Sequence, residues 1–271
     1  MKEMYVPLSG AIAREKQLTM VTNNLANVNS VGYKKEKAIF RVRPPETDLP
    51  KMDESANRRL NLPNSRQRVE GNRNYTAVAE SFTDFSTGET RATGNPFDMA
   101  IQEMNPRSEA RGFFVVQTPE GPRYTRKGNF EVDAAGRLVD TNGNPVLATN
   151  GQPLVVGPRP FEPIVVSPEG NVVVQERTVG QIQRVVVDDP NQLEKQGHGL
   201  FNDRNGEVPV RNVAPADNMA VRQRYLEMAN TNVVEELVQM IDLQRAYTAF
   251  ERSIQTFDDA SGQVINWAME R

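Results

Sequence analysis

The residues best suited to catalysis are few in this sequence. The single histidine, His198, lies between two glycines in the stretch Gln196-Gly-His-Gly-Leu200. A general base needs a partner acid or nucleophile at a fixed geometry, and the nearest acids, Glu194 and Asp203, lie in the same loop-like region. Backbone freedom, which glycine provides, is the main property of this stretch. We therefore expect no catalytic role for His198.

Paired carboxylates could hydrolyse a glycosidic bond if they converged on one cleft. The two adjacent pairs here, Asp188-Asp189 and Asp258-Asp259, are instead expected to diverge. Neighbouring residues point to opposite faces of a strand, and they differ in direction by about 100° on a helix. With one histidine and no cysteine, thiolate and transition-metal sites are not expected either. The sequence predicts a protein that is not an enzyme and has no cofactor or metal site.

Charge and hydropathy exclude several other classes. The chain has 271 residues, of which 32 are Lys or Arg and 35 are Asp or Glu, for a net charge of −3. This balance gives no reason to expect a nucleic-acid partner. No apolar run is long enough to cross a membrane, so no membrane insertion is expected. Met1–Met20 lacks the apolar core of a signal peptide, which indicates a cytosolic protein or export without a cleaved signal.

One amphipathic helix is predicted near the N-terminus. Between Val6 and Val28, apolar residues recur at spacings typical of one helix face. The asparagines favour an end near Asn27, and Gly32 marks a turn. The apolar stripe needs a partner surface. Its last four members are therefore predicted assembly contacts: Leu18, Val21, Leu25 and Val28.

Two different compositions follow this helix, whose segment we place at residues 1–33. Residues 34–80 combine several prolines with many charges and few large apolar side chains, which predicts a linker that is extended or disordered in the free chain. Residues 81–213 contain short β-branched and aromatic runs separated by turn signals such as Asn142-Gly143. No helical patterns alternate with these runs, so we predict a central, mainly antiparallel β domain.

The last segment, residues 214–271, has the clearest pattern. Asn232 is placed to cap a helix while Glu235 reaches back toward it, as in a capping box. Apolar residues then keep a seven-residue frame, which Glu236 interrupts, over about thirty residues. The frame predicts a helix with a coiled-coil seam. Its predicted assembly contacts are Val233, Leu237, Met240, Leu243, Tyr247, Phe250, Ile254 and Phe257.

The two amphipathic helices stand at opposite ends of the chain. They could pair with each other, or each could dock separately on the β domain, and the patterns alone weight the two arrangements about equally. The heptad spacing favours pairing, because a sheet face rarely requires so many heptad-spaced anchors. The predicted fold is therefore α+β, with terminal helices forming a coiled-coil module and a central antiparallel, mainly-β domain.

Four sequence stretches carry a family resemblance. The first is Leu18–Lys35, in which the core Asn23-Asn24-Leu25-Ala26-Asn27 is followed by Gly32-Tyr33. The others are Thr93–Ala100 with Gly112–Val116, Tyr124–Phe130 with Asp133–Leu138, and Asn230–Tyr247. In this order they resemble the flagellar rod and hook proteins, and they span nearly the whole chain. The resemblance therefore rests on the four stretches together.

The resemblance implies a structural subunit of the bacterial flagellar basal-body rod. Such a protein is exported through the flagellar type III apparatus without signal cleavage. It polymerises helically with itself and other rod proteins, and transmits torque from the motor to the hook and filament. Hook or ring components are further implied partners. The ending Ile254–Ala260 is more similar to the proximal rod protein than to the distal one.

One departure and three alternatives accompany this interpretation. Glu103–Arg111 lengthens a turn that is short in the family, and this loop is a candidate partner contact. A hook or distal-rod member of the same family is the nearest alternative. A peptidoglycan-acting enzyme is a different class, but the sequence spacing indicates no convergent carboxylates. A non-flagellar coiled-coil adhesin or phage-tail part would explain the terminal helices but not the four stretches.

Overall fold

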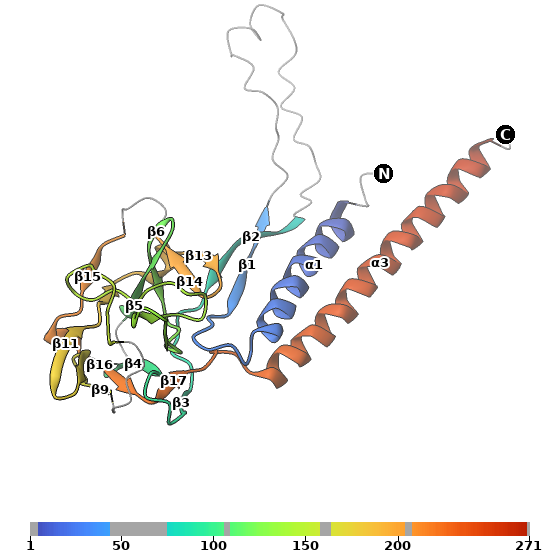
Figure 1. Ribbon diagram of the computed structural model, residues 1–271. Helices are drawn as coiled ribbons and strands as arrows, with labels where there is room; N and C mark the ends of the chain where they lie inside the picture. The colour runs from blue at the N-terminus through green and yellow to red at the C-terminus, as the bar shows by residue number, and fades with distance from the viewer. Residues whose placement is uncertain (1–4, 44–74, 106–108, 158–163, 204–207, 270–271) are drawn as a thin grey trace, which may run out of the picture. The chain divides into compact units, whose positions relative to one another are not determined.

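The computed structural model describes residues 5–43, 75–105, 109–157, 164–203 and 208–269 (Figure 1). These residues divide into two compact units. The helical unit takes its residues from 1–22, 38–81 and 237–271, and the β unit takes its residues from 23–37 and 82–236. Each unit combines segments that are far apart in the sequence, so neither is a simple stretch of chain.

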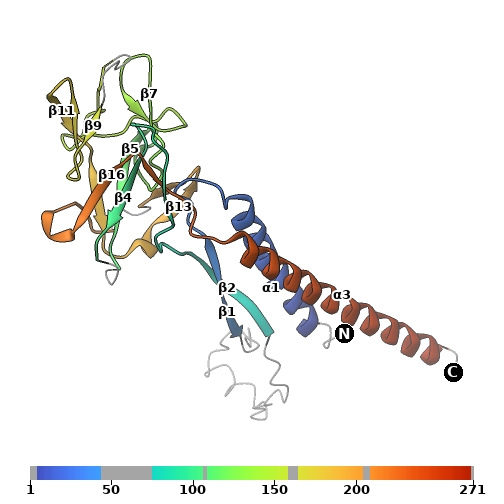
Figure 2. The ribbon, with the colours of Figure 1, turned by 90° about the horizontal axis from the view of Figure 1, so that it is seen from below.

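The helical unit contains the two long helices, α1 (Tyr5–Ala26) and α3 (Val233–Met269), which continue at one end into the β unit. Figures 1 and 2 both show α1 and α3 side by side. A Cβ atom added at Gly10 would lie only 2.7 Å from the Phe250 ring, so glycine permits a close approach of the helices here. The Arg14 guanidinium lies 5.7 Å from the centre of the Phe40 ring, which joins α1 to the neighbouring strand.

That strand belongs to a pair that the sequence analysis did not anticipate. Residues 34–80 were expected to form an extended linker, but β1 (Glu36–Arg43) and β2 (Tyr75–Thr83) form a two-stranded sheet at its two ends. The middle of the predicted linker, residues 44–74, lies outside the described residues. The strands were missed because their apolar alternation is short and is surrounded by charged residues.

The start of α3 follows the predicted cap only in part. The Asn232 side-chain oxygen accepts a hydrogen bond from the Val234 N–H at 2.9 Å, as an N-cap should. The second contact differs from a capping box, in which Glu235 would reach back to Asn232. Here the Thr231 hydroxyl donates a hydrogen bond to the Glu236 carboxylate at 2.9 Å. Glu236, which interrupts the heptad frame, is buried at 3% exposure.

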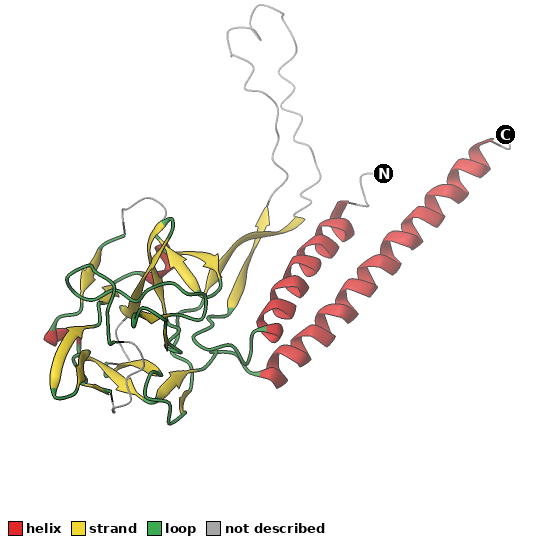
Figure 3. Ribbon diagram, viewed as in Figure 1, coloured by secondary structure: helices red, strands yellow, loops and turns green. Residues whose placement is uncertain are grey.

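The β unit is built around a six-stranded antiparallel sheet, shown in yellow in Figure 3. Its strand order is β13 (Glu194–Gly197), β14 (Leu200–Asn202), β6 (Gly121–Thr125), β5 (Arg111–Thr118), β12 (Arg184–Val187) and β15 (Val210–Asn212). A short 3-10 turn, η2 (Pro190–Gln192), precedes β13. The central strands are the most buried, as expected for a sheet covered on both faces.

Smaller antiparallel sheets complete the β unit. They are β11 (Arg177–Gln181) with β10 (Asn171–Val174) and β9 (Val165–Val166), β16 (Met219–Gln223) with β4 (Met99–Glu103), β17 (Tyr225–Glu227) with β3 (Thr90–Ala92), and β7 (Glu131–Val132) with β8 (Leu138–Val139). A second 3-10 turn, η3 (Pro215–Asp217), precedes β16. The predicted mainly antiparallel β domain is therefore confirmed.

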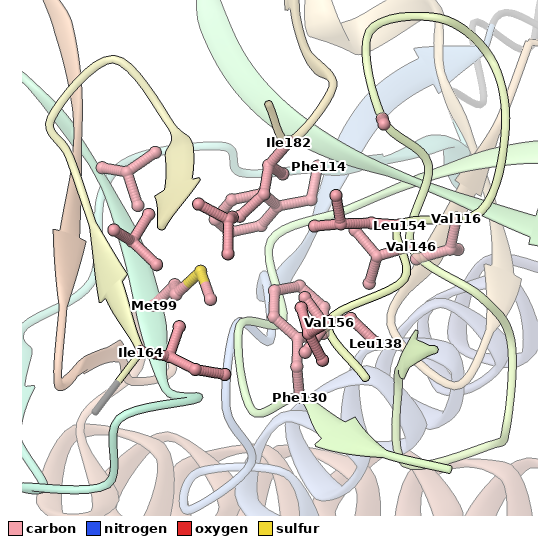
Figure 4. Packing of buried hydrophobic residues seen from close by; sticks show 14 of the residues in the cluster. Met99, Phe114, Val116, Phe130, Leu138, Val146, Leu154, Val156, Ile164 and Ile182 are labelled. Atoms are coloured by element: carbon pink, nitrogen blue, oxygen red, sulfur yellow. The ribbon is translucent and has the colours of Figure 1, made fainter. Parts of the chain in front are cut away.

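Two hydrophobic clusters form the core of the β unit, and β5 contributes to both. Phe114 and Val116 belong to the larger cluster, and Phe113 and Val115 to the smaller one. This alternation follows from the period of two along a strand. Figure 4 shows the larger cluster, in which Phe114 and Phe130 pack edge to face with ring centres 5.3 Å apart. Within the described ranges, no helix combines the length and apolarity that a membrane span requires.

Candidate functional site

The asparagines of the N-terminal motif organise the end of α1. Asn24 is 3% exposed, and its side-chain oxygen accepts hydrogen bonds from the Glu36 N–H (2.9 Å) and the Tyr33 hydroxyl (3.1 Å). Its amide nitrogen donates to the Glu36 carbonyl at 3.0 Å. The Asn27 amide donates to the Asn23 carbonyl at 2.9 Å. These side chains therefore satisfy backbone groups where the helix ends and the chain turns toward β1.

Gly32 lies in this turn, directly against the backbone of Arg126 and Lys127. Its φ of +63° lies in the left-handed region, and its N–H donates to the Glu227 carbonyl at 2.7 Å. A Cβ atom at this position would lie 2.6 Å from the backbone carbon of Arg126 and the backbone nitrogen of Lys127. Both the conformation and the space therefore require glycine.

A buried ion pair follows two residues later. The Lys34 ammonium donates to the Glu227 carboxylate at 2.6 Å and to the Ser86 carbonyl at 2.7 Å. The second oxygen of Glu227 accepts a hydrogen bond from Nε of Arg126 at 2.9 Å. Lys34, Arg126 and Glu227 are each no more than 2% exposed. Charged groups are rarely buried to this degree unless they are paired, as these are.

The ion pairs extend through Arg126 to the start of β5. Arg126 donates from Nη1 to the Glu103 carboxylate at 2.9 Å and to the Gly112 carbonyl at 2.6 Å. The other oxygen of Glu103 lies 3.7 Å from Nε of Arg111. We call the five charged residues the buried charge cluster: Lys34, Glu103, Arg111, Arg126 and Glu227. It contains three cations and two carboxylates.

Burial and neighbouring charges shift the pKa values of the cluster. Burial lowers the pKa of Lys34 from 10.5 to about 8, and the Arg126 charge adds to this effect while Glu227 opposes it. Burial works against ionisation of Glu227, but the charges of Arg126 and Lys34 outweigh it and lower the pKa of that carboxyl. The cluster therefore keeps Glu227 ionised and makes the Lys34 proton easier to remove.

Asn230, the first residue of the C-terminal motif, completes the junction. Its side-chain oxygen accepts a hydrogen bond from the Lys35 N–H at 2.8 Å, and its amide donates to the Asp84 carbonyl at 2.7 Å. The Asn230 N–H also donates to the Tyr33 carbonyl at 3.4 Å. The motifs around Asn24, Arg126 and Asn230 thus meet at one place in the β unit, although the sequence separates them by up to two hundred residues.

The predicted assembly contacts on the helices fall into three exposure classes. Val21 and Leu243 are buried, at 4% and 6% exposure. Val233, Leu237 and Phe257 are exposed, at 41%, 38% and 39%. The other members are half-buried: Leu18, Leu25, Val28, Met240, Tyr247, Phe250 and Ile254. Ala26, a motif residue, is exposed. The most covered seam of α3 therefore runs from Met240 to Ile254.

A second apolar stripe on α3 was not singled out from the sequence. Val234, Val238 and Ile241 are 67%, 53% and 45% exposed and follow the spacing of one helix face. Leu8 and Ile12 form a similar exposed pair on α1, at 43% and 46%. We call the three α3 residues the outer stripe. Exposed apolar patches of this kind mark interaction surfaces more often than single exposed residues do.

The candidate chemical groups lie apart from this junction. His198 is exposed on the turn between β13 and β14 with a φ of +52°, and it lines an open pocket of about 290 Å³ with Glu120 and Gln196. Asp189 caps η2 by accepting a hydrogen bond from the Asn191 N–H at 3.2 Å. Asp258 and Asp259 are exposed on α3. In the described part of the chain, no group of three or more acidic or histidine side chains could hold a metal ion.

Three family models match the sequence. Residues 4–34 match a model described as a flagella basal body rod protein, and residues 109–174 match the flagellar hook protein FlgE/F/G D1 domain. Residues 222–266 match the C-terminal model of the flagellar basal body rod FlgEFG proteins. The first and last of these models cover the terminal motifs that meet at Asn24 and Asn230.

Full-length relatives give the same result. A flagellar basal-body rod protein FlgF of Caulobacter vibrioides is 31% identical over 271 residues, covering 99% of this chain and 96% of the relative. A flagellar basal-body rod protein FlgG of Bacillus subtilis is 29% identical, covering 98% of both chains. A flagellar hook-basal body complex protein FlhO of the same organism is 28% identical, again covering 98% of both.

Proposed function

Since the chain belongs to the family of flagellar basal-body rod and hook proteins, we propose that it is a structural subunit of the flagellar rod, not an enzyme. The observation that carries this proposal is the 31% identity to a basal-body rod protein over 99% of the chain. The match covers the terminal helices as well as the β unit, so it includes every element that the proposed assembly uses. The proposed location is the basal body.

The proposed assembly mechanism is helical polymerisation through the terminal helices. The close approach of α1 and α3 at Gly10 and Phe250 supports their pairing as a coiled-coil module. The spacing of the covered seam, with Met240, Leu243 and Tyr247 three and four residues apart, is that of a coiled coil. We assign this seam to contacts within the subunit.

Contacts between subunits then require other surfaces. The outer stripe and the exposed pair Leu8 and Ile12 provide apolar area that the single chain leaves uncovered. Burying such side chains against a neighbouring copy contributes about 1.5–3 kcal/mol for each fully covered residue. In a polymer the same contact recurs in every subunit, so even a modest contribution for each contact stabilises the whole assembly.

The proposed partners are other copies of this chain and other rod proteins, with the export apparatus as a transient partner. Hook or ring components are further candidates. A proximal position in the rod rests on the ending Ile254–Ala260, and the relatives divide between the names FlgF and FlgG at similar identity. Electron microscopy of basal bodies from a strain that lacks this protein separates the positions: loss of a distal subunit leaves the proximal segment in place, and loss of a proximal subunit leaves a shorter rod.

An assembly assay tests the proposed function directly. Purified chain is concentrated and examined by negative-stain electron microscopy, alone and with Ile241→Asp. We expect ordered rods or filaments from the unaltered chain and none from Ile241→Asp, because a charge in an apolar contact costs several kcal/mol. Glu251→Gln is the control, since Glu251 is exposed on the same helix. Assembly by Ile241→Asp would show that the outer stripe is not an interface.

A further inference from the structure

The segment 23–37, which we call the N-terminal strap, contributes nothing to the hydrophobic clusters of the β unit. Both clusters take their residues from between Phe85 and Val221. Tyr33 is the only apolar side chain of the strap that is buried, at 6% exposure, and the Lys195 ammonium lies 4.2 Å from the centre of its ring. The two clusters themselves are complete without the strap. Since apolar burial is the dominant favourable contribution to folding, the β domain without the strap retains its main source of stability.

Polar contacts hold the strap on this domain. Lys34 is bound by Glu227 and the Ser86 carbonyl, as described above. Glu36 pairs with Lys195 at 2.9 Å, and Lys37 pairs with Asp84 at 2.7 Å. Removal of the charges from water offsets much of the attraction in a buried ion pair, so the strap depends on a few charge-assisted hydrogen bonds, chiefly the two that Lys34 donates. A segment held mainly in this way opens more easily than an apolar core.

The charge cluster is balanced without the strap. Lys34 is the only member that the strap supplies, and without it two cations, Arg111 and Arg126, face two carboxylates, Glu103 and Glu227. Glu227 also keeps the hydrogen bond that it accepts from the Gly88 N–H at 2.9 Å. Departure of the strap therefore leaves no buried carboxylate without a partner, which removes the usual penalty for breaking a buried pair.

We propose that the N-terminal strap is a releasable latch on the β domain. The ammonium of Lys34 enters a site formed by the Glu227 carboxylate and the Ser86 carbonyl, and the strap docks and undocks while the β domain stays folded. The latch is a property of the single chain, so it does not depend on the assignment to the rod. Its effect is to control whether the end of α1 is fixed to the β domain.

Hydrogen exchange on the full chain, read by mass spectrometry, tests the latch. In Lys34→Met, we expect the strap amides, including those of Gly32 and Lys35, to exchange at least tenfold faster. The amides of β5 and β12 should change by less than twofold. Lys37→Met is the matched control, because the Lys37 side chain is 49% exposed and its pair is at the surface. That control should alter strap exchange by less than twofold.

Two outcomes overturn the proposal. Unchanged strap exchange in Lys34→Met shows that Lys34 does not hold the strap. An equal loss of protection in the strap and in β5 shows that the strap belongs to the cooperative core. A second measurement uses the unaltered chain, in case the variant does not fold. When hydrogen exchange is measured at a series of low urea concentrations, exchange of the strap amides should depend less on urea than exchange of the β5 amides, because release of the strap exposes less surface than unfolding of the β domain. An equal urea dependence for both sets of amides contradicts the latch.

Discussion

Glu227 holds the buried charge cluster together, and the substitution Glu227→Gln tests that role. Its carboxylate accepts hydrogen bonds from Lys34, Arg126 and the Gly88 N–H. Glutamine keeps the size of the side chain and one acceptor oxygen but removes the negative charge. The cluster changes from three cations and two carboxylates to three cations and one. An excess of one positive charge therefore becomes an excess of two inside the β unit.

The expected loss of stability follows from breaking a buried pair while keeping its cations. Such changes cost about 3–5 kcal/mol, and we expect the lower end because glutamine still accepts from Gly88. For a domain of this size, a loss of about 3 kcal/mol lowers the melting temperature by roughly 6–12 °C. Thermal melting followed by circular dichroism measures this change. Glu131→Gln is the control, because Glu131 is exposed on β7 and lies outside the cluster.

A double variant separates charge from shape. Adding Lys34→Met to Glu227→Gln restores the original excess of one positive charge, so part of the lost stability should return. We expect a gain of at least about 1 kcal/mol over the single variant. A Glu227→Gln protein that melts within a degree of the unaltered chain would refute the role of Glu227. A double variant less stable than the single one would refute the argument from charge balance.

Four further predictions concern the strap, the stripe and the histidine. Gly32→Ala should weaken docking of the strap by about 1–3 kcal/mol, measured by hydrogen exchange of the strap amides, because its φ and its space both exclude a Cβ; unchanged exchange would contradict the close contact with Arg126. Between pH 8 and 10.5 the unfolded chain holds the Lys34 proton more tightly than the folded chain, so Lys34 should make stability rise with pH there by about 1 kcal/mol per unit; Lys34→Met should reduce the rise in urea titrations at pH 8 and 9.5 to the part from Lys127, whose pKa burial also lowers. Val238→Asp should prevent sedimentable assemblies without lowering the melting temperature of the β unit, and normal pelleting would exclude the outer stripe. His198→Ala should leave melting and swimming unchanged, and normal melting with lost swimming would reveal a contact made by His198.

The sequence predicted the parts of the fold that depend on local pattern. The aromatic and β-branched run Phe113–Gln117 predicted a strand, and the structure assigns alternate residues of that strand to two separate clusters. The heptad frame from Met240 to Ile254 corresponds to the most covered face of α3. In both cases the period of the apolar residues fixes which side chains share a face.

The junction could not be predicted in the same way, because its contacts are far apart in the sequence. Lys34 and Glu227 are separated by 193 residues, and neither has an apolar period that indicates burial. The motif resemblance did include Lys34 and Arg126 but gave them no role. Glu103 opens the lengthened loop that was considered as a partner contact, and its side chain instead binds Arg126 inside the unit. The one local signal for the junction is a charged residue close to a glycine of the motif, as Lys34 follows two positions after Gly32.

The exposed stripe was missed for a different reason. A heptad frame selects the residues that repeat over the longest distance, and Val234, Val238 and Ile241 repeat over fewer than three turns of α3. A short apolar stripe has little weight in a pattern search, although its exposure in the structure is high. Burial therefore distinguishes the covered face of α3 from the exposed stripe that we propose contacts neighbouring subunits, which spacing alone does not do.

This chain is a member of the flagellar rod and hook family, and we propose that it polymerises through surfaces on its terminal helices. The most direct test is electron microscopy of basal bodies isolated from a strain in which the chain is replaced by Ile241→Asp, beside one that carries Glu251→Gln. We expect complete rods and swimming with Glu251→Gln, and basal bodies with a truncated rod and no swimming with Ile241→Asp. Complete rods that contain the Ile241→Asp chain would contradict it.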